Sequence, residues 1–302
     1  QNPPGSEWMY VKIYSAGPTA DRLLSRAVAP LVRQALEREW IDGWFFIRYA
    51  DPEPHLRVRF HGTPSTLQEH LLPALNDVVA AQLQMPGVWR AQLDTYEREI
   101  ERYGGDDGML VSERIFQIDS DAALAITDLV VRGRLNAADR WRVALVGVEL
   151  LIGDLGLDAT QRKGVVESLR VAYRDEHAVP PPLVRAMSER FRTERPLLFS
   201  MLDAALGGGS AEHSQLGRGV REGLEILQMR SARLAPFASE LRTLSAEARL
   251  TISLSELAAS HVHMSVTRQL RSAVRAQETV IYDFLSRLHA MPGLARDRAP
   301  SE

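Results

Sequence analysis

Polar side chains alternate with apolar ones along residues 55–60, HLRVRF. Alternate residues of a strand point to the same side, so His55, Arg57 and Arg59 share one face of a predicted strand. Neighbouring guanidiniums repel each other unless an anion lies between them, and arginine offers a rigid donor fork for carboxylate or phosphate. This face is therefore a candidate anion site. The alternative is the solvated outer face of an antiparallel sheet.

A second candidate lies far along the chain, in residues 260–268, SHVHMSVTR. Residues three or four apart share a helix face, which groups His263 with Thr267, while His261 and Arg268 lie on a different face. Histidine exchanges protons near neutral pH, so His263 is a candidate acid or base. The other interpretation is a hydrogen-bonded structural histidine, and both stay open at this point.

A dense run of charges occupies residues 96–105, YEREIERYGG, and contains Arg98 and Arg102. It is either a solvated strand end whose ion pairs satisfy one another or an extension of the cationic site. Two acids follow, Glu113 and Asp119. They are either helix-surface acids or partners that orient these arginines.

These side chains need elements to hold them, and the first hundred residues alternate strand and helix periods. Strands are predicted over 8–14, 43–50, 55–61 and 88–97, and helices over 18–39 and 64–84. This β-α-β-β-α-β order is that of a ferredoxin-like unit, in which both helices cover one sheet face. The face that carries Arg57 and Arg59 is then the open one, and another part of the chain must cover it.

After the glycine pair that ends residues 96–105 the pattern becomes helical. Helices are predicted near 109–132, 137–153, 158–175, 182–204, 214–234, 243–259 and 261–289, with a flexible connector at 207–210 and a frayed tail over 290–302. The expected fold class is α+β. A ferredoxin-like unit over 1–105 packs through its open sheet face on a mostly helical region, 106–302, and a cleft between them is the expected ligand site.

Composition excludes several classes of protein. The 302 residues are 45% hydrophobic and 25% charged, as in an ordinary globular protein, and a net charge of −3 gives no sign of a protein that coats nucleic acid. The absence of cysteine excludes disulfides, thiolate metal sites and cysteine nucleophiles, and eight histidines without HExxH spacing argue against a metal site. We expect no metal and no cofactor. No apolar stretch of membrane-spanning length and no signal-like segment occur, so we expect a soluble, cytoplasmic protein without a membrane partner.

Three segments together resemble one family. They are residues 44–60 (WFFIRYADPEPHLRVRF), the pair TYEREIERYGG and SERIFQIDS, and the late HMSVTR. They are similar to the C-terminal domain of class I lantibiotic dehydratases, which also occurs as a separate polypeptide in thiopeptide and related peptide-antibiotic pathways. The resemblance runs from about Trp8 to Leu288. This chain departs from it at Thr267, where the family shows an asparagine before the arginine.

The resemblance implies a lyase. In that family a separate domain or protein glutamylates serine and threonine side chains of a precursor peptide, using glutamyl-tRNA. The C-terminal domain then eliminates glutamate, which leaves dehydroalanine or dehydrobutyrine. The implied partners are the precursor peptide and a separate glutamyl-tRNA-dependent glutamylating protein, with no direct contact to nucleic acid. A homodimer is left open.

The resemblance also implies roles for single residues. Elimination needs a base, a stabiliser of the developing oxyanion, a carboxylate clamp and a proton donor. Arg57 and Arg59 match the clamp and the charge stabiliser, and His263 matches the proton-transfer histidine better than His261 does. Arg98, or in second place Arg102, is similar to a further arginine of that site. Residues assigned to substrate binding are His55, Arg48, Arg102, Thr267 and Arg268. The base for the Cα proton is not identified, since His263 could act both ways or an arginine-assisted water could act.

Two other functions stay open. Stand-alone proteins of the same superfamily condense two dehydroalanines by a formal [4+2] cycloaddition, form a pyridine ring and release the leader peptide. The retained arginine strand and YEREIERYGG segment favour elimination, whereas Thr267 favours cycloaddition. The other function is a non-catalytic subunit that binds the leader peptide along a sheet edge. A nucleic-acid-binding function has little support, because no aromatic-plus-basic strand of the RNA-binding type occurs.

Overall fold

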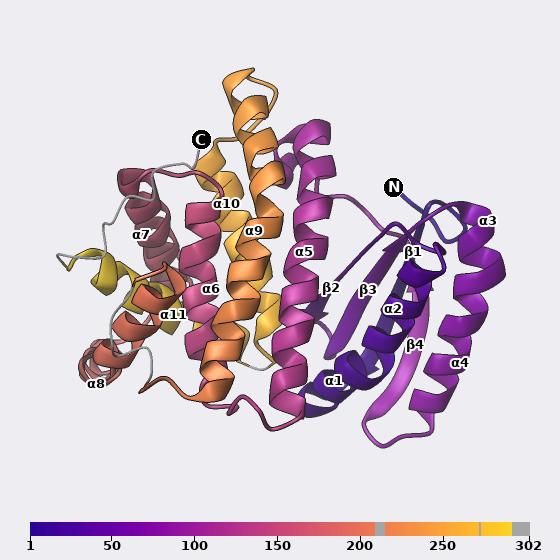
Figure 1. Ribbon diagram of the computed structural model, residues 1–302, viewed down its shortest axis with the longest axis horizontal. Coiled ribbons are helices and arrows are strands. Elements are labelled where there is room, and N and C mark those ends of the chain that lie inside the picture. Colours follow the sequence, from indigo (N-terminus) through magenta and orange to yellow (C-terminus); the bar gives the residue numbers. More distant parts are fainter. Residues whose placement is uncertain (209–214, 272, 292–302) are drawn as a thin grey trace.

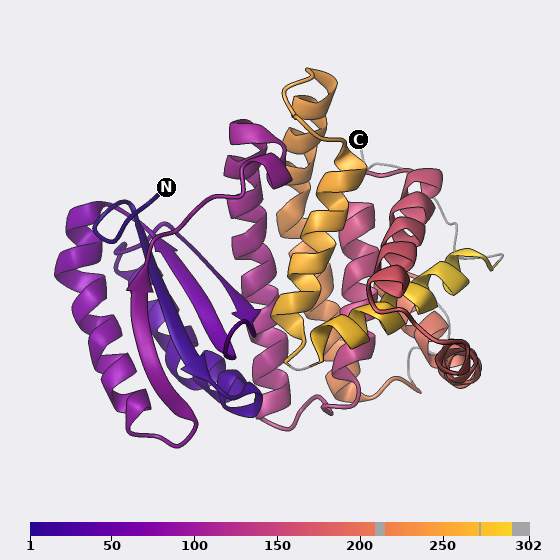
Figure 2. The same ribbon diagram turned by 180° about the vertical axis from the view of Figure 1, so that it is seen from behind.

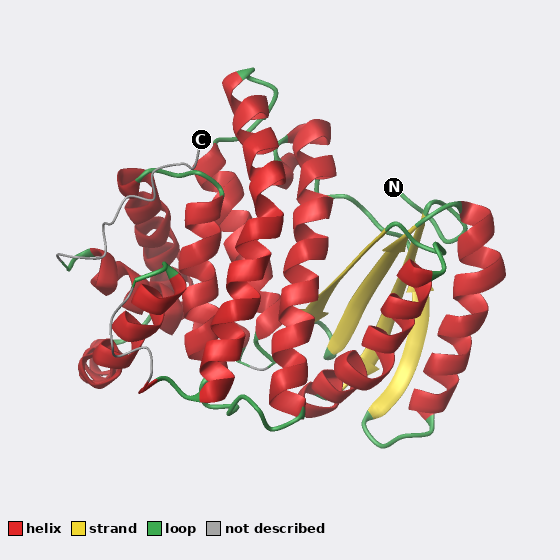
Figure 3. Cartoon of the chain, in the orientation of Figure 1, coloured by secondary structure: helices red, strands yellow, loops and turns green. Residues whose placement is uncertain are grey.

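The computed structural model describes residues 1–208, 215–271 and 273–291. The protein is mixed α+β and mostly helical, with one small four-stranded antiparallel sheet in the N-terminal part (Figure 3). A sheet region, residues 8–94, and a helical region, residues 105–289, lie side by side (Figure 1). Part of the predicted connector at 207–210 and most of the predicted tail lie outside the described residues. No helix in the described ranges is long and apolar enough to cross a membrane.

The sheet follows the predicted succession of elements. Its strands are β1 (Trp8–Ser15), β2 (Gly43–Tyr49), β3 (His55–His61) and β4 (Val88–Asp94), in the order β2-β3-β1-β4 with antiparallel neighbours. The first predicted helix consists of α1 (Gly17–Leu23), a π-turn (Leu24–Val28) and α2 (Ala29–Glu37). The second consists of α3 (Pro64–Thr66), a π-turn (Leu67–Leu71) and α4 (Leu72–Leu83).

One face of the sheet packs on these helices. Leu56, Val58 and Phe60 of β3 are fully buried there, in a cluster that includes Leu24 and Leu71. The alternation in the sequence is therefore confirmed, and the four polar residues of β3, including His55, Arg57 and Arg59, lie on the opposite face. Figure 2 looks onto that opposite face, beside which the helical region stands.

The helical region contains α5 (Gly105–Val131), α6 (Arg140–Asp154), α7 (Ala159–Glu176), α8 (Pro181–Ala205), α9 (Arg218–Ala246), α10 (Leu254–Gln269) and α11 (Val274–His289). The first four predicted helices are confirmed within a few residues. The fifth, 214–234, lies within α9 from residue 218 on, but α9 continues to Ala246. The last two predictions have the wrong boundaries, because 243–259 contains the break between α9 and α10, and 261–289 contains the break between α10 and α11.

The errors have a physical reason. Pro236 lies inside α9 without ending it. The true reversals pass through Ala248 and Ala273, which have left-handed backbone angles (φ 54° and 47°) that the sequence signals only when glycine or asparagine occupies the position. The start of α10 does carry a readable signal, a capping box in which Ser253 and Glu256 satisfy each other's backbone N–H groups.

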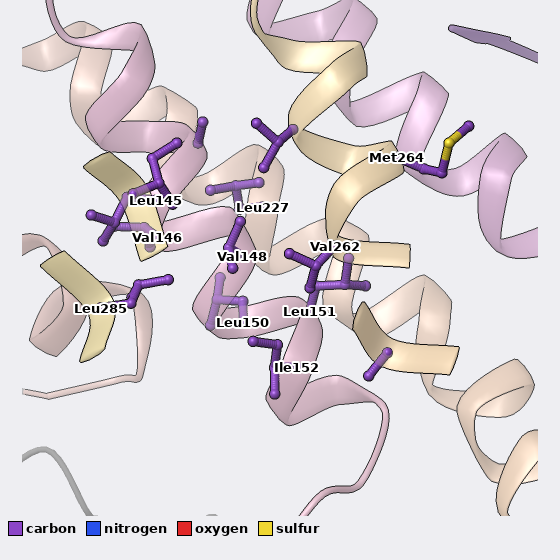
Figure 4. Packing of buried hydrophobic residues seen from close by; sticks show 14 of the residues in the cluster. Leu145, Val146, Val148, Leu150, Leu151, Ile152, Leu227, Val262, Met264 and Leu285 are labelled. Atoms are coloured by element: carbon purple, nitrogen blue, oxygen red, sulfur yellow. The ribbon is translucent and has the colours of Figure 1, made fainter. Parts of the chain in front are cut away.

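Helix α6 forms the centre of the helical region. Leu145, Leu150 and Leu151 are almost completely buried on it, and Leu227 of α9, Val262 of α10 and Leu285 of α11 lie around it (Figure 4). A helix that is apolar on all sides belongs in the interior. This packing fixes α10, the helix with both candidate histidines, against a rigid support.

The sequence predicted that the helical region packs on the open sheet face. It packs along the edge strand β2 and on one end of that face, where Trp8, Tyr10 and Phe45 join the hydrophobic cluster of the helical region. The outer backbone groups of Phe46 are satisfied by helices, because its N–H donates to Ser120 Oγ of α5 (3.2 Å) and its carbonyl accepts from Arg268 Nε of α10 (2.9 Å). Only the aromatic end of the open face is covered, where Phe45 packs on Phe116 with ring centres 5.2 Å apart. A strand edge needs such partners, which is why the contact forms there.

Candidate functional site

Arg59 is almost completely buried among aromatic rings on the open sheet face. Its guanidinium carbon lies 4.3 Å from the ring centre of Tyr10, 4.7 Å from that of Tyr96 and 5.1 Å from that of Phe45. Within the described part of the chain no carboxylate pairs with it and its covered Nε has no hydrogen-bond partner. Burial lowers the pKa of Arg59. This is a cation that the protein itself leaves unpaired.

Arg57 lies two residues along and is half-buried. Its guanidinium stacks on the Tyr49 ring at 3.5 Å, and its Nε donates to His55 Nε2 (3.1 Å). His55 Nδ1 contacts the Glu53 carbonyl at 2.7 Å, so this nitrogen carries the proton and Nε2 accepts. Burial lowers the pKa of His55, which keeps the ring neutral. Among the described residues the two terminal nitrogens of Arg57 have no protein partner and remain free for a ligand.

Arg98 is engaged by the protein itself. Its Nε and Nη2 donate to the two carboxylate oxygens of Glu113 on α5 (2.7 and 2.9 Å), and the Tyr96 hydroxyl donates to the same carboxylate (2.9 Å). Of the two readings of Glu113, the structure therefore shows the orienting partner. Because Tyr96 also packs on Arg59, the Arg98–Glu113 pair supports the ring against which that guanidinium lies.

Arg102 makes longer contacts with other residues than Arg98 does. Its Nη1 forms an ion pair with Glu99 (3.0 Å), and its Nε makes a long contact to Ser260 Oγ of α10 (3.5 Å). This contact ties the segment after β4 to the helix that carries the histidines.

Arg48 and Arg268, predicted to bind substrate, form ion pairs with aspartates in a buried seam between β2 and the helices, and Arg48 also lines the cavity described below. Arg48 forms an ion pair with Asp21 of α1 (2.7 Å), which also binds Arg140 of α6 (2.6 Å). Arg268 forms an ion pair with Asp119 of α5 (3.0 Å), which also binds Arg230 of α9 (2.9 Å). Burial alone would raise the pKa of Asp21, but the two guanidiniums hold it below its usual value. We define the seam by these six residues together with His261 and Ser112.

His261 is a buried member of this seam. It is 2% exposed, its Nε2 lies 3.2 Å from Ser112 Oγ, and its ring packs beside Tyr103 and Phe116. Burial lowers the pKa of His261 to about 3, with a smaller contribution from Arg268. A neutral, enclosed imidazole of this kind is a packing residue.

His263 lines the wall of a large cavity. The cavity has a volume of about 1130 Å³ and lies between the β2–β3 turn, the start of α8 and the start of α11. Apolar lining residues are Val179, Leu183, Met187, Val274 and Val280, and cationic ones are Arg48, Arg271 and Arg275. Thr267 also lines it, and its hydroxyl donates to the His263 carbonyl (2.8 Å). On its inner side, His263 Nδ1 lies 2.7 Å from Glu278 Oε1 and 2.9 Å from the Tyr173 hydroxyl.

Tyr49 joins the two candidate sites. It stacks under the Arg57 guanidinium and also lines the cavity that His263 faces. The structure thus brings Arg57, Arg59 and His55 together on the sheet and sets His263 and Thr267 in an adjoining cavity. Sequence analysis did not identify Tyr49, Tyr173 or Glu278. Tyr49 had a readable signal as the last residue of β2, whereas the other two lie on helices distant in sequence.

The residues of these two sites can carry out two kinds of chemistry, anion binding and proton exchange. Unpaired guanidiniums bind carboxylates and stabilise developing negative charge. A histidine whose ring is held from one side can exchange a proton on the other.

Comparisons with known proteins show to which family the chain is similar. The model of the family described as "Lantibiotic biosynthesis dehydratase C-term" matches residues 8–289. The subtilin biosynthesis protein SpaB of Bacillus subtilis is 33% identical over 117 residues, which are 39% of this chain and 11% of SpaB. The chain therefore matches only about a tenth of the length of that relative.

Two solved structures are similar over almost the whole chain. The tRNA-dependent lantibiotic dehydratase MibB from Microbispora sp. 107891 superposes with a TM-score of 0.73 at 25% identity, covering 94% of this chain and 28% of MibB. The pyridine synthase TbtD from thiomuracin biosynthesis superposes with a TM-score of 0.65 at 17% identity, covering 94% of this chain and 98% of TbtD, a likeness of fold alone. Since its model spans nearly all of the sequence, this chain belongs to the lantibiotic biosynthesis dehydratase C-terminal family.

Proposed function

We propose that this protein is a carbon–oxygen lyase that eliminates glutamate from glutamylated serine or threonine side chains of a ribosomally made precursor peptide. The observation that carries the proposal is the pair Arg57 and Arg59, two guanidiniums on one strand face without carboxylate partners in the described chain. They adjoin, through Tyr49, the cavity that His263 lines. Membership of a dehydratase family supports this proposal.

The reaction proposed for this site balances as follows. A base removes the Cα proton of the modified residue, and the electrons of that bond form the Cα=Cβ double bond. The Cβ–O bond breaks, and glutamate leaves with the electron pair as a carboxylate. The product is dehydroalanine from serine or dehydrobutyrine from threonine.

Each arginine has a role in this scheme. Arg57 presents two free terminal nitrogens and suits the carboxylate of the glutamyl group, because a guanidinium binds carboxylate through paired donors. Arg59 stabilises negative charge from beneath, since a buried, unpaired cation acts strongly at low dielectric. Arg98 acts through Glu113 and Tyr96 as a positioning residue, and the half-buried Arg102 beside Ser260 is the better placed of the two to meet substrate.

His263 is the proposed proton-transfer residue. It can take the Cα proton and return it to the departing carboxylate or to water, and its exposed edge faces the cavity. His55 orients Arg57, and Thr267 fixes the backbone of His263. The remaining assignments follow from these: the precursor peptide is the substrate, and a separate glutamyl-tRNA-dependent protein supplies its glutamylated form. We also infer that strands β1–β4 with α1–α4 form a ferredoxin-like unit, since their order follows the split βαβ pattern.

One observation favours a second function, the cycloaddition that makes a pyridine. The cavity of about 1130 Å³ has mostly apolar walls and is larger than a glutamyl side chain needs. A long apolar peptide segment with two dehydroalanines would use that volume.

A single assay separates the functions. The purified protein is incubated with pre-glutamylated precursor and, separately, with a precursor that carries dehydroalanines, and the products are followed by mass spectrometry. Release of free glutamate from the first supports the lyase. A macrocycle with released leader from the second replaces the lyase by the synthase, and binding without turnover of either replaces both by a leader-binding subunit.

A further inference from the structure

A buried carboxylate stands behind the cavity histidine. Glu278, on α11, is completely buried, and its Oε1 lies 2.7 Å from His263 Nδ1 and 3.0 Å from the hydroxyls of Tyr173 and Tyr282. All three contacts converge on one oxygen. A buried carboxylate that accepts three hydrogen bonds is a rigid feature of the interior.

The direction of these hydrogen bonds can be worked out. Burial, together with the charge of Glu278, raises the pKa of Tyr173 and of Tyr282, so both phenols keep their protons near neutral pH. The Tyr282 hydroxyl has Glu278 as its acceptor and donates to it. Arg275 Nη1 donates to the Tyr173 oxygen (2.7 Å). The single hydroxyl hydrogen of Tyr173 has two acceptors within reach, His263 Nδ1 (2.9 Å) and Glu278 Oε1 (3.0 Å), and it goes to the carboxylate because an ionised acceptor binds a hydrogen more strongly than a neutral ring nitrogen.

The position of the histidine proton follows. Glu278 Oε1 accepts from both phenols and, as a carboxylate oxygen, offers His263 an acceptor and no proton. We propose that Glu278 is a positioning residue that holds neutral His263 in the Nδ1–H tautomer and leaves Nε2 unprotonated toward the cavity. The catalytic meaning of this assignment rests on the proposed function, because Nε2 would then be the atom that takes the Cα proton.

The pairing also sets the charge balance of the catalytic step. When His263 gains a proton at Nε2, the new positive charge lies beside the buried Glu278 carboxylate and is stabilised by it. The cavity wall itself carries three cations, Arg48, Arg271 and Arg275, and one acid, Asp51. Glu278 is the carboxylate in direct hydrogen-bond contact with the His263 ring.

The chain contains a matched control. His289, at the end of α11, places its Nε2 2.6 Å from Oε2 of Glu149, a buried residue of α6. This second histidine–glutamate pair has the same chemistry and a similar burial, but neither residue lines the cavity. Glu149→Gln thus measures how far the loss of a buried histidine partner lowers stability when the cavity is not involved.

The test measures the tautomer directly. Protein with ¹⁵N-labelled histidine is studied by long-range ¹H–¹⁵N correlation spectra, and the His263 signals are assigned from a His263→Gln variant. We expect wild type to show the Nδ1–H form for His263. Glu278→Gln, whose amide can donate to Nδ1, should shift His263 toward the Nε2–H form and lower the turnover of glutamylated peptide at least a hundredfold at nearly unchanged KM. Glu149→Gln should change neither quantity.

Several results would overturn the proposal. The first is an Nε2–H tautomer of His263 in the wild-type spectrum, which is decisive even if Glu278→Gln does not fold. The second is wild-type turnover in Glu278→Gln with an altered tautomer. The third is an equal loss of turnover in Glu149→Gln. Glu278→Asp keeps the charge and should retain more activity than Glu278→Gln. If wild type shows the Nδ1–H form but releases no glutamate, the positioning stands and the proposed lyase function fails.

Discussion

Buried arginines occur in two regions of this protein, in the seam with carboxylate partners and on the open sheet face without them in the described chain. In the seam, Arg268 and Arg48 are buried with the carboxylates of Asp119 and Asp21. On the open sheet face, Arg59 is equally buried but lies only among aromatic rings. A buried cation with an anionic partner holds elements together, whereas one without a partner is left for a ligand. Partners, and not burial, distinguish structural arginines from those of the candidate site.

The two histidines of α10 repeat the contrast two residues apart. His261 belongs to the seam, where burial keeps its ring neutral. His263 faces the cavity and has a carboxylate behind it. About half a turn of helix thus separates a packing residue from a residue that can exchange protons.

The sharpest test of this contrast is to remove each histidine in turn. His263→Ala should lower the rate of glutamate elimination by about 10² to 10⁴-fold, the range for loss of a general acid or base. His261→Ala should leave elimination within a fewfold of wild type and act mainly on stability, because it opens a hole among Tyr103 and Phe116. The measurement is release of glutamate from pre-glutamylated peptide. A stall in His261→Ala alone would reverse the assignment of the two residues.

The seam predicts a large loss of stability without an effect on chemistry. Asp119→Asn leaves Arg230 and Arg268 buried without their shared anion. Breaking a buried ion pair from one side costs about 3–5 kcal/mol of unfolding free energy. Denaturant unfolding measures this loss. A change below about 1 kcal/mol would mean that seam arginines tolerate the absence of a partner, and the contrast with Arg59 would disappear.

Arg59 should behave in the opposite way. Arg59→Met keeps the side-chain length and removes the charge, so elimination should fall about a hundredfold or more, which corresponds to roughly 3 kcal/mol of lost charge stabilisation. The unfolding free energy should stay level or rise, because the variant no longer buries an unpaired cation. Kinetics and denaturant unfolding on the same sample test both halves. Retained turnover would remove Arg59 from the site.

A smaller effect separates charge from shape. Arg59→Lys keeps the positive charge but replaces the planar guanidinium, which stacks on Tyr10 and Tyr96, by a compact ammonium. Elimination should fall less than in Arg59→Met but remain clearly below wild type. Comparison of kcat for the two variants provides the measurement. If Arg59→Lys were fully active, positive charge alone would suffice and the stacked geometry would be irrelevant.

A gradual effect is the pH dependence of stability that the buried His261 creates. The pKa of His261 is lowered by burial to about 3, so below about pH 6.5 the unfolded chain binds a proton that the folded protein does not. Stability from this group is complete above that pH and falls by up to about 1.4 kcal/mol per pH unit as the pH drops toward 3. His261→Asn should show a flatter decline of unfolding free energy between pH 6.5 and 4. Parallel wild-type and variant curves would contradict the buried neutral state.

The sequence predicted those parts of the fold that depend on residues close together in the chain, such as the alternation of a strand or a glycine at the start of a helix. The alternation in β3 assigned Leu56 and Arg57 to the correct faces, because a period of two leaves no other arrangement. The glycines at 104 and 105 marked the start of α5, where both have left-handed angles (φ 83° and 92°). The break between α10 and α11 was missed because Ala273 takes such an angle without being glycine.

The sequence predicted the grouping of candidate site residues only where these residues lie on the same strand or helix. Arg57, Arg59 and His55 share a strand, and their grouping could be read from spacing. The aspartate partner of Arg268 is Asp119, 149 residues away, and no spacing rule connects the two. The ion pairs of Arg48 and Arg268 were therefore not predicted, and both arginines were assigned to substrate binding from the resemblance alone.

The hydrogen bonds from α5 and α10 to the outer edge of β2 have a consequence for synthesis of the chain. On the outer side of β2, the Phe46 N–H donates to Ser120, and the Phe46 carbonyl accepts from Arg268, which lies 222 residues further along the chain. While the chain grows from its N-terminus, the sheet can form long before α10 exists, and that edge then stays open. An open edge recruits strands from other molecules. Truncation before α10 should therefore yield a protein that aggregates through β2, even though the strands of its sheet are all present.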